Sequence, residues 1–131
     1  MKKNNKKSDG FTLIEVMFVV VVIAILASIS MSYFFKFKQK AYDTLTLAEI
    51  DSFKKAQRMY QIDHHSYAGN VGDTVGNDGA ASTFSVSGYE PGKGSRITVI
   101  AAPDPFVVEA VNIKSSTVIE YNFTTNVITK R

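Results

Sequence analysis

The sequence predicts an α+β protein in which one long N-terminal helix packs on a four- to five-stranded antiparallel sheet. Three observations support this prediction. Residues 16–35 form a run of twenty residues without a charge, and residues 36–62 continue without Pro or Gly in a helical pattern of apolar positions. Residues 83–130 alternate short β-rich runs with turn residues. The second half of the helix is the only element long enough to cover the sheet.

The charge-free run is long enough to cross a bilayer. Twenty residues at about 1.5 Å per residue span about 30 Å, which matches the hydrocarbon core of a membrane. Glu15 lies just before this run. An unpaired carboxylate in a membrane helix costs on the order of 2.5 kcal/mol, so we expect Glu15 to be shallow, protonated or paired. The run predicts one membrane-spanning helix over residues 11–35.

A short basic segment precedes this helix, and it ends in a glycine that is followed by Phe-Thr-Leu-Ile-Glu. In these residues and their order, the first 40 residues resemble the type IV pilin and pseudopilin family. The resemblance implies that a prepilin peptidase cleaves after Gly10, which makes residues 1–10 a leader, and that Phe11 becomes N-methylated. It also implies that Glu15 meets the N-terminal amine of a neighbouring subunit. Gly10 and Phe11 are the predicted processing residues, and Glu15 is the predicted assembly residue.

Elementary electrostatics agrees with this pairing. Cleavage before Phe11 creates an amine that the precursor lacks, and a cation beside a buried carboxylate offsets part of the desolvation cost of both. Phe11 and Glu15 are one helical turn apart, so a pair within one subunit remains an alternative. The chain departs from many family members in having Ser32 in place of Pro and Ala24 in place of Gly. The absence of Pro predicts a straighter helix.

The net charge of +3 comes from the leader, whose charged residues are Lys2, Lys3, Lys6, Lys7 and Asp9. Residues 11–131 hold 11 basic and 11 acidic residues, so net charge gives no support for a nucleic-acid partner, and only a local basic patch could provide one. The chain has no cysteine, which excludes disulfides and thiol chemistry. Four lysines precede the apolar run and three follow it, at 36, 38 and 40, so the positive-inside rule weakly favours a cytoplasmic leader. The resemblance implies the same orientation.

The helical pattern in residues 36–62 predicts a stripe that packs on the sheet. The stripe comprises Ala41, Leu45, Ala48, Ser52, Ala56 and Met59, flanked by Tyr42, Phe53 and Tyr60. Leu47, Ile50 and Ile62 fall outside it, either as scattered exposed side chains or as a second contact face towards neighbouring subunits. A helix over residues 11–62 would extend roughly 78 Å, more than a domain of this size can cover. Its first half therefore needs lipid or other copies of the chain.

The remaining residues predict the rest of a globular domain over 36–131, with a loop at 63–82 and a sheet within 83–130. The predicted strands are 83–89, 96–102, 106–113, 117–123 and 126–130. Ile119, Tyr121 and Phe123 alternate with Glu120 and Asn122, which predicts one packed face and one face towards water.

Two groups of residues have side chains that bind metals in other proteins. Asp73, Asn77 and Asp78 offer oxygens for calcium, which some pseudopilins bind, but their spacing is not that of a known calcium loop and turn chemistry explains them. His64 and His65 are adjacent and therefore share no helix face. We predict no metal and no cofactor.

The sequence has no Gly-rich phosphate loop followed by a helix and no nucleophile elbow, so we predict a non-enzyme. The resemblance implies a structural subunit of a type IV pilus-like filament. Its implied partners are copies of itself, other pilin-like subunits, the prepilin peptidase and an inner-membrane assembly platform, with the lipid bilayer before assembly and a surface or periplasmic filament afterwards. The alternatives are a pseudopilin of a type II secretion or DNA-uptake apparatus, and a single-pass membrane-anchored binding module.

Overall fold

The structure is a computed structural model that describes residues 10–131, so residues 1–9 of the predicted leader lie outside the described residues. The chain divides into two compact units. The first ends at Lys36 and is called the N-terminal unit; the second, Phe37–Arg131, is called the globular unit.

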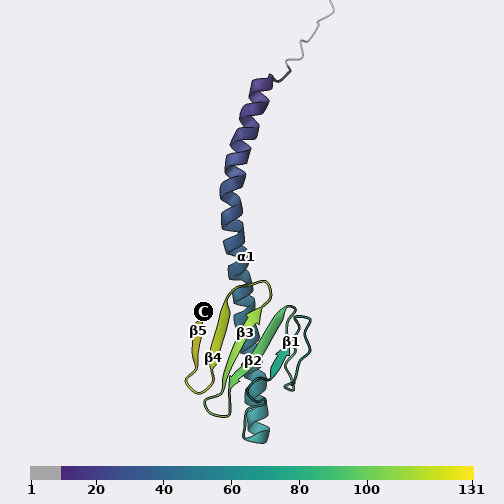
Figure 1. Cartoon of the computed structure of the whole chain (residues 1–131), viewed down its shortest axis with the longest axis vertical. Helices are drawn as coiled ribbons and strands as arrows, with labels where there is room; N and C mark the ends of the chain where they lie inside the picture. The colour runs from purple at the N-terminus through teal and green to yellow at the C-terminus, as the bar shows by residue number, and fades with distance from the viewer. Residues whose placement is uncertain (1–9) are drawn as a thin grey trace, which may run out of the picture. The chain divides into compact units, whose positions relative to one another are not determined.

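Helix α1, Leu13–His64, belongs to both units (Figure 1). Its 52 residues contain neither Pro nor Gly, so nothing interrupts the backbone hydrogen bonds. It ends where His65 takes a positive φ of 54° while its N–H still donates to Gln61 O at 2.9 Å, which satisfies one of the last helical carbonyls. Every described side chain up to residue 41 is exposed, and Thr46 is the first buried one.

The globular unit contains a five-stranded antiparallel sheet in the order β1-β2-β3-β4-β5, and α1 covers one face of it (Figure 1). The strands are β1 Thr74–Gly76, β2 Ser95–Ala101, β3 Val107–Asn112, β4 Val118–Asn122 and β5 Val127–Lys130. The predicted α+β class is confirmed.

One predicted strand is wrong and one observed strand was not predicted. Residues 83–89 form no strand, and β1 lies inside the predicted loop 63–82. In this segment Phe84, Val86 and Tyr89 are apolar, and Val86 and Tyr89 are buried in the core although the segment is not a strand. β1 forms because Gly76 lets the chain approach β2: a Cβ on Gly76 would lie 2.8 Å from Ser95 O.

The predicted packing stripe of α1 is also wrong in part. The helix buries Thr46, Ile50, Phe53, Ala56 and Gln57, whereas Leu45, Ala48, Ser52 and Met59 are exposed. Two of the buried residues are polar and satisfied internally. Thr46 Oγ1 donates to Tyr42 O at 3.0 Å, and the Gln57 amide both donates to Ala68 O and accepts from Ala68 N at 2.8 Å. Because these polar residues face the core, the hydrophobic pattern alone placed the packing face on the wrong side.

Phe53 forms the centre of the core between helix and sheet. Its side chain is 0% exposed, and its ring makes edge contacts with Phe84, Tyr89 and Phe123 at centroid distances of 6.3, 5.1 and 6.3 Å. Edge-to-face arrangements of this kind add to the stabilisation from burial. The core therefore combines the helix, the coil before β2 and the end of β4.

Candidate functional site

The predicted processing residues lie just before α1. Gly10 and Phe11 are exposed and precede the first helical residue, Leu13. No atom lies within 4 Å of the place that a Cβ on Gly10 would take. The described backbone around the predicted cleavage position is therefore free of packing against the rest of the described chain.

Glu15 closes the first turn of α1 together with Thr12. The Thr12 N–H and Oγ1–H donate to Glu15 Oε2 at 2.8 and 2.7 Å, and the Glu15 N–H donates weakly to Thr12 Oγ1 at 3.4 Å. This reciprocal arrangement is a capping box, and it places a carboxylate at the positive end of the helix dipole. Thr12 is thus a residue of the site that the predictions above do not include, although the spacing Thr-x-x-Glu is the sequence signal for such a box.

The capping box gives the Glu15 carboxylate a hydrogen-bond partner within its own chain. Thr12 supplies this partner in the uncleaved chain. Phe11 has no free amine before cleavage, so its pairing with Glu15 stays a prediction. Among residues 10–131, the hydrogen bonds to this carboxylate all go to Oε2. Within this range Oε1 accepts no hydrogen bond, so the exposed Glu15 side chain can accept one there from a donor on another molecule.

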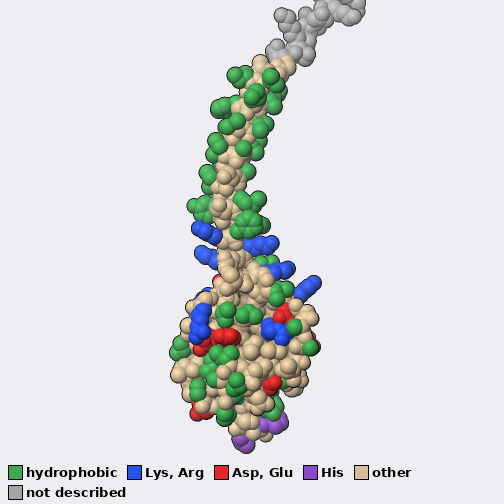
Figure 2. All heavy atoms as spheres, viewed as in Figure 1, with side chains coloured by type: hydrophobic (Ala, Val, Ile, Leu, Met, Phe, Trp, Pro, Cys, Tyr) green, Lys and Arg blue, Asp and Glu red, His purple; other side chains and the backbone are tan. Residues whose placement is uncertain are grey.

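An uncovered apolar surface extends from both sides of Glu15 along the N-terminal unit (Figure 2). Leu13, Ile14, Met17, Phe18 and Val21 line a shallow apolar concavity. By length and composition, α1 contains a segment that is able to cross a membrane. An isolated apolar surface of this size signals contact with lipid or protein.

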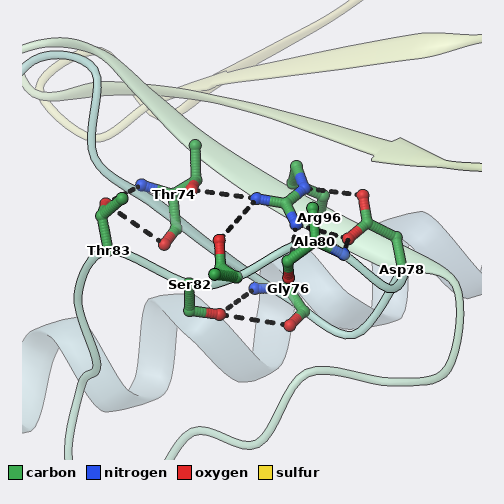
Figure 3. A network of polar contacts seen from close by, with 8 residues as sticks. Thr74, Gly76, Asp78, Ala80, Ser82, Thr83 and Arg96 are labelled. Carbon is green, nitrogen blue, oxygen red and sulfur yellow. Dashed lines mark hydrogen bonds and ion pairs between the residues drawn. The ribbon is translucent and has the colours of Figure 1, made fainter.

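The predicted calcium candidates are engaged in a different network (Figure 3). Arg96 Nε donates to Asp78 Oδ2 at 2.6 Å, and a second bond runs from Nη2 to Oδ1. Arg96 also donates to Thr74 Oγ1 at 2.9 Å and to Ala80 O at 3.0 Å. The guanidinium therefore ties the loop after β1 to β2.

The other two calcium candidates have separate partners. Asp73 accepts from the Asn70 N–H at 2.7 Å and from Thr83 Oγ1 at 3.2 Å, and Asn77 Nδ2 donates to Pro91 O at 3.5 Å. Within residues 10–131, no three His, Cys, Asp or Glu side chains are placed to hold a metal ion. An arginine thus neutralises the loop carboxylate that a cation would otherwise balance.

We expect Asp78→Asn to lower the free energy of unfolding at pH 7 by about 1–2 kcal/mol. Hydrogen bonds from Arg96 lower the pKa of Asp78 to about 2, and both side chains are largely buried, at 13% and 15% exposure. Because the folded-state pKa lies below the usual value of about 3.9, this stability is present above pH 4 and is lost as the pH falls through about 2. Urea unfolding at several pH values measures it.

The matched control for this prediction is Asp104→Asn, because Asp104 is exposed and accepts one bond, from Thr124 Oγ1 at 3.1 Å. We expect a change within about 0.5 kcal/mol. Calcium and EDTA should leave the melting temperature of the natural chain unchanged. A rise in melting temperature with calcium would show that the loop binds the cation despite Arg96.

The histidines at the end of α1 lie apart from this network. The His64 ring stacks on Tyr60 with centroids 4.0 Å apart, and its Nδ1 lies 3.2 Å from Tyr60 O. His65 adopts the left-handed conformation that ends the helix. These positions give both histidines local structural roles at the helix terminus.

One family model and several curated proteins match parts of this chain. Residues 5–31 match the family described as the prokaryotic N-terminal methylation motif. The chain is 40% identical over 65 residues to the type IV wide pilus major component PilA4 of Thermus thermophilus, covering 50% of each protein. It is 38% identical over 61 residues to type II secretion system core protein G of Escherichia coli, covering 47% of this chain and 42% of that protein.

The corresponding core protein G of Vibrio cholerae is 38% identical over 65 residues, covering 50% of this chain and 44% of that protein. The chain thus spans half or less of the length of the curated relatives that it matches. These matches confirm the predicted resemblance to the type IV pilin and pseudopilin family, whose N-terminal methylation motif this chain carries.

Proposed function

We propose that this chain is a structural, non-enzymatic subunit of a type IV pilus-like filament. It is made as a membrane-inserted precursor, is cleaved after Gly10 and N-methylated at Phe11, and assembles through the apolar part of α1. The observation that carries this proposal is the surface of residues 13–35, whose apolar side chains are all exposed and which includes, near its start, the capped carboxylate of Glu15.

Burial of this surface supplies the driving force for both states of the subunit. Removing one large apolar side chain from water is worth about 1.5–3 kcal/mol. The described residues of the N-terminal unit contain many such side chains and no buried one. Lipid covers them in the precursor, and the helices of other copies and of other pilin-like subunits cover them in the filament.

In this proposal Glu15 sets the axial position of each subunit against its neighbour, whereas the apolar surface supplies most of the binding free energy between subunits. Its Oε2 is held by Thr12, so the carboxylate has a fixed place at the helix start, and Oε1 is left for the methylated Phe11 amine of a neighbour. An ion pair buried between apolar helices tolerates little displacement, because separating the charges there leaves both uncompensated. Each added subunit is thereby set at one axial position.

A second contact face lies on the outward side of α1 in the globular unit. Along this side, exposed positions recur at alternating spacings of four and three residues. They are Ala41, Leu45, Ala48, Ser52, Lys55, Met59 and Ile62, of which only Lys55 is charged. This heptad-like spacing suits packing against another helix. These residues, rather than Leu47 and Ile50, which pack on the core, form the face that we assign to neighbouring subunits.

The proposed life cycle sets the localisation and partners. The precursor crosses the inner membrane once, with the leader in the cytoplasm and the globular unit outside. A prepilin peptidase removes the leader, and an inner-membrane assembly platform moves the subunit into a surface or periplasmic filament. The apolar segment of α1 and the methylation motif support this sequence of events.

A pseudopilin of a type II secretion apparatus is the second candidate. The supporting observation is that relatives named as type II secretion core protein G match almost as well as the pilus component, at 38% against 40% identity. Processing and helix assembly would be the same in both. Deleting the chain separates them, because a pilus subunit is needed for long surface fibres and a pseudopilin for export of folded proteins.

Replacing Gly10 by Ala should block cleavage, and intact-mass spectrometry of the purified chain measures it. The natural chain should begin at N-methylated Phe11, whereas the variant should retain the leader. The variant reports on the peptidase alone, because no atom lies within 4 Å of the added Cβ. Ser32→Ala, outside the matched motif, is the control and should be processed normally. A natural chain that starts anywhere other than methylated Phe11 would contradict the proposal.

A further inference from the structure

The turn between β3 and β4 is held against the first helical residues of the globular unit. Gln39 Nε2 donates to Ser116 Oγ at 2.6 Å, and Ser115 Oγ donates to Asp43 Oδ1 at 2.6 Å. Lys114 Nζ lies 5.7 Å from the centre of the Tyr42 ring. Contacts separated by more than 70 positions in the sequence thus fix this turn beside residues 39–43 of α1.

The register of the sheet brings two more lysines to the same end. Ser95 pairs with Asn112, and the Ile113 N–H donates to Gly94 O at 2.9 Å, which places Lys93 beside the turn. The Val118 N–H donates to Arg131 O at 3.0 Å, which places Lys130 beside it on the other side. Five exposed lysines therefore share one end of the globular unit, here called the basic end: Lys38, Lys40, Lys93, Lys114 and Lys130. Figure 2 shows lysine and arginine side chains gathered there.

The charge at the basic end is not cancelled by ion pairs. None of its lysines makes a salt bridge to another residue in the range 10–131. Two carboxylates close to the basic end already accept other bonds. Asp43 accepts from Ser115 and Thr117 hydroxyls, and Glu49 accepts from Tyr89 OH at 2.9 Å and the Gly92 N–H at 3.0 Å.

The opposite end of the sheet carries the opposite charge. Asp63 lies in the last turn of α1, Asp73 precedes β1, and Asp104 lies between β2 and β3. Residues 37–131 hold equal numbers of basic and acidic residues, so the unit is neutral overall. Its charge is separated between two ends, and even with the exposed Glu90 the basic end retains a positive excess.

Exposed apolar side chains accompany the lysines. Ile113, at the tip of the turn, is 62% exposed, and Phe37 is exposed at the start of the unit. Lysines around a few protruding apolar residues are typical of surfaces that rest on anionic membranes, where the charges meet phosphate groups and the apolar groups enter the interface. A nucleic-acid ligand would also contact the lysines through its phosphates, but it would not explain the exposed apolar side chain of Ile113.

The sequence places a bilayer within reach of this end. Lys38 follows Phe35, the last residue of the charge-free run, by three positions. We propose that the basic end docks on anionic phospholipid headgroups of the outer leaflet, with Ile113 as its apolar contact. This inference rests on the proposed membrane insertion of the N-terminal unit. Docking would hold the precursor on the bilayer, and assembly would have to break it.

A tryptophan at position 113 tests the proposal directly, because the chain contains no other tryptophan. Full-length Ile113→Trp is reconstituted into vesicles of brominated phosphatidylcholine with or without phosphatidylglycerol. We expect strong quenching and a blue shift with phosphatidylglycerol, and little of either without it. Val71→Trp is the matched control, because Val71 is also 62% exposed but lies in the loop before β1, at the opposite end.

Lysine variants supply the electrostatic test. Each variant combines Ile113→Trp with one lysine substitution: Lys38→Gln, Lys40→Gln or Lys114→Gln. We expect each substitution to lower the ratio of docked to undocked chain about fivefold. Lys55→Gln should leave the ratio unchanged, because Lys55 is also exposed but lies about four helical turns beyond Lys40. Equal quenching in all these variants would overturn the proposal.

Two further outcomes separate this inference from the proposed function. Phe18→Trp reports insertion of the apolar segment itself. Quenching at position 18 without quenching at position 113 would overturn headgroup docking and leave the membrane anchor intact, whereas the absence of both would overturn both. If the tryptophan at position 113 were protected from brominated lipid and also from aqueous iodide, a second copy would cover this surface and the lipid assignment would be overturned.

Discussion

Filaments should fall about 100-fold in amount when Glu15 is replaced by Gln, while cleavage after Gly10 stays normal. The Gln amide cannot neutralise the Phe11 amine of a neighbour, which leaves an uncompensated charge between apolar helices. Such a charge costs several kcal/mol, and a cost of about 2.8 kcal/mol already corresponds to a 100-fold decrease in assembly. Electron microscopy and immunoblots of sheared surface material measure the filaments, and mass spectrometry of the membrane fraction confirms processing. Polymers as abundant as those of the natural chain would contradict the role that we assign to Glu15.

The capping box calls for a second variant beside Glu15→Gln. Thr12→Val removes the hydroxyl that bonds to Oε2 but keeps the carboxylate charge. Loss of the cap should cost about 1 kcal/mol of helix stability, so we expect a roughly fivefold decrease in filaments. If Thr12→Val proved as severe as Glu15→Gln, capping of α1 rather than pairing between subunits would explain the requirement for Glu15.

Replacing Phe53 by Ala should lower the free energy of unfolding of the globular unit by about 3–5 kcal/mol. The ring is fully buried and contacts Phe84, Tyr89 and Phe123, so its removal leaves a cavity at the meeting point of helix, coil and sheet. Near-ultraviolet circular dichroism of the full-length chain in detergent follows the unfolding. A loss below about 1 kcal/mol would show that the core refills the space.

Phe37→Ala is the control for Phe53→Ala. Phe37 is the same residue type on the same helix, but its side chain is exposed. We expect a change within about 0.5 kcal/mol. Both variants should be cleaved after Gly10 as the natural chain is, because the described residues around Gly10 make no contact with the core.

The extent of the elements could be predicted because it depends on local signals. The absence of Pro and Gly gave a helix over 11–62, and the structure has Leu13–His64. Four predicted strands agree with β2 to β5 within one residue at each end. Turn residues such as Pro103-Asp104-Pro105 and Lys114-Ser115-Ser116 separate these strands, and turns are among the clearest local signals.

The pairing of distant residues could not be predicted in the same way. The burial of Gln57 depends on Ala68, 11 positions away, whose backbone satisfies both polar groups of the Gln57 amide. β1 is only three residues long and exists because β2 offers a pairing edge. Arg96 reaches Asp78 across 18 positions in the sequence, which no spacing rule anticipates. At Glu15, by contrast, the Thr-x-x-Glu signal was local and available.

The first buried side chain of the described residues is Thr46, so the folding core and the apolar surface proposed for assembly have no residue in common. Sequence change in residues 46–123 is therefore constrained by the packing of the core, and change in residues 13–35 by what lipid and neighbouring helices accept. The two regions can diverge at different rates. A family of such subunits could keep a nearly uniform way of polymerising while presenting many different surfaces to its surroundings.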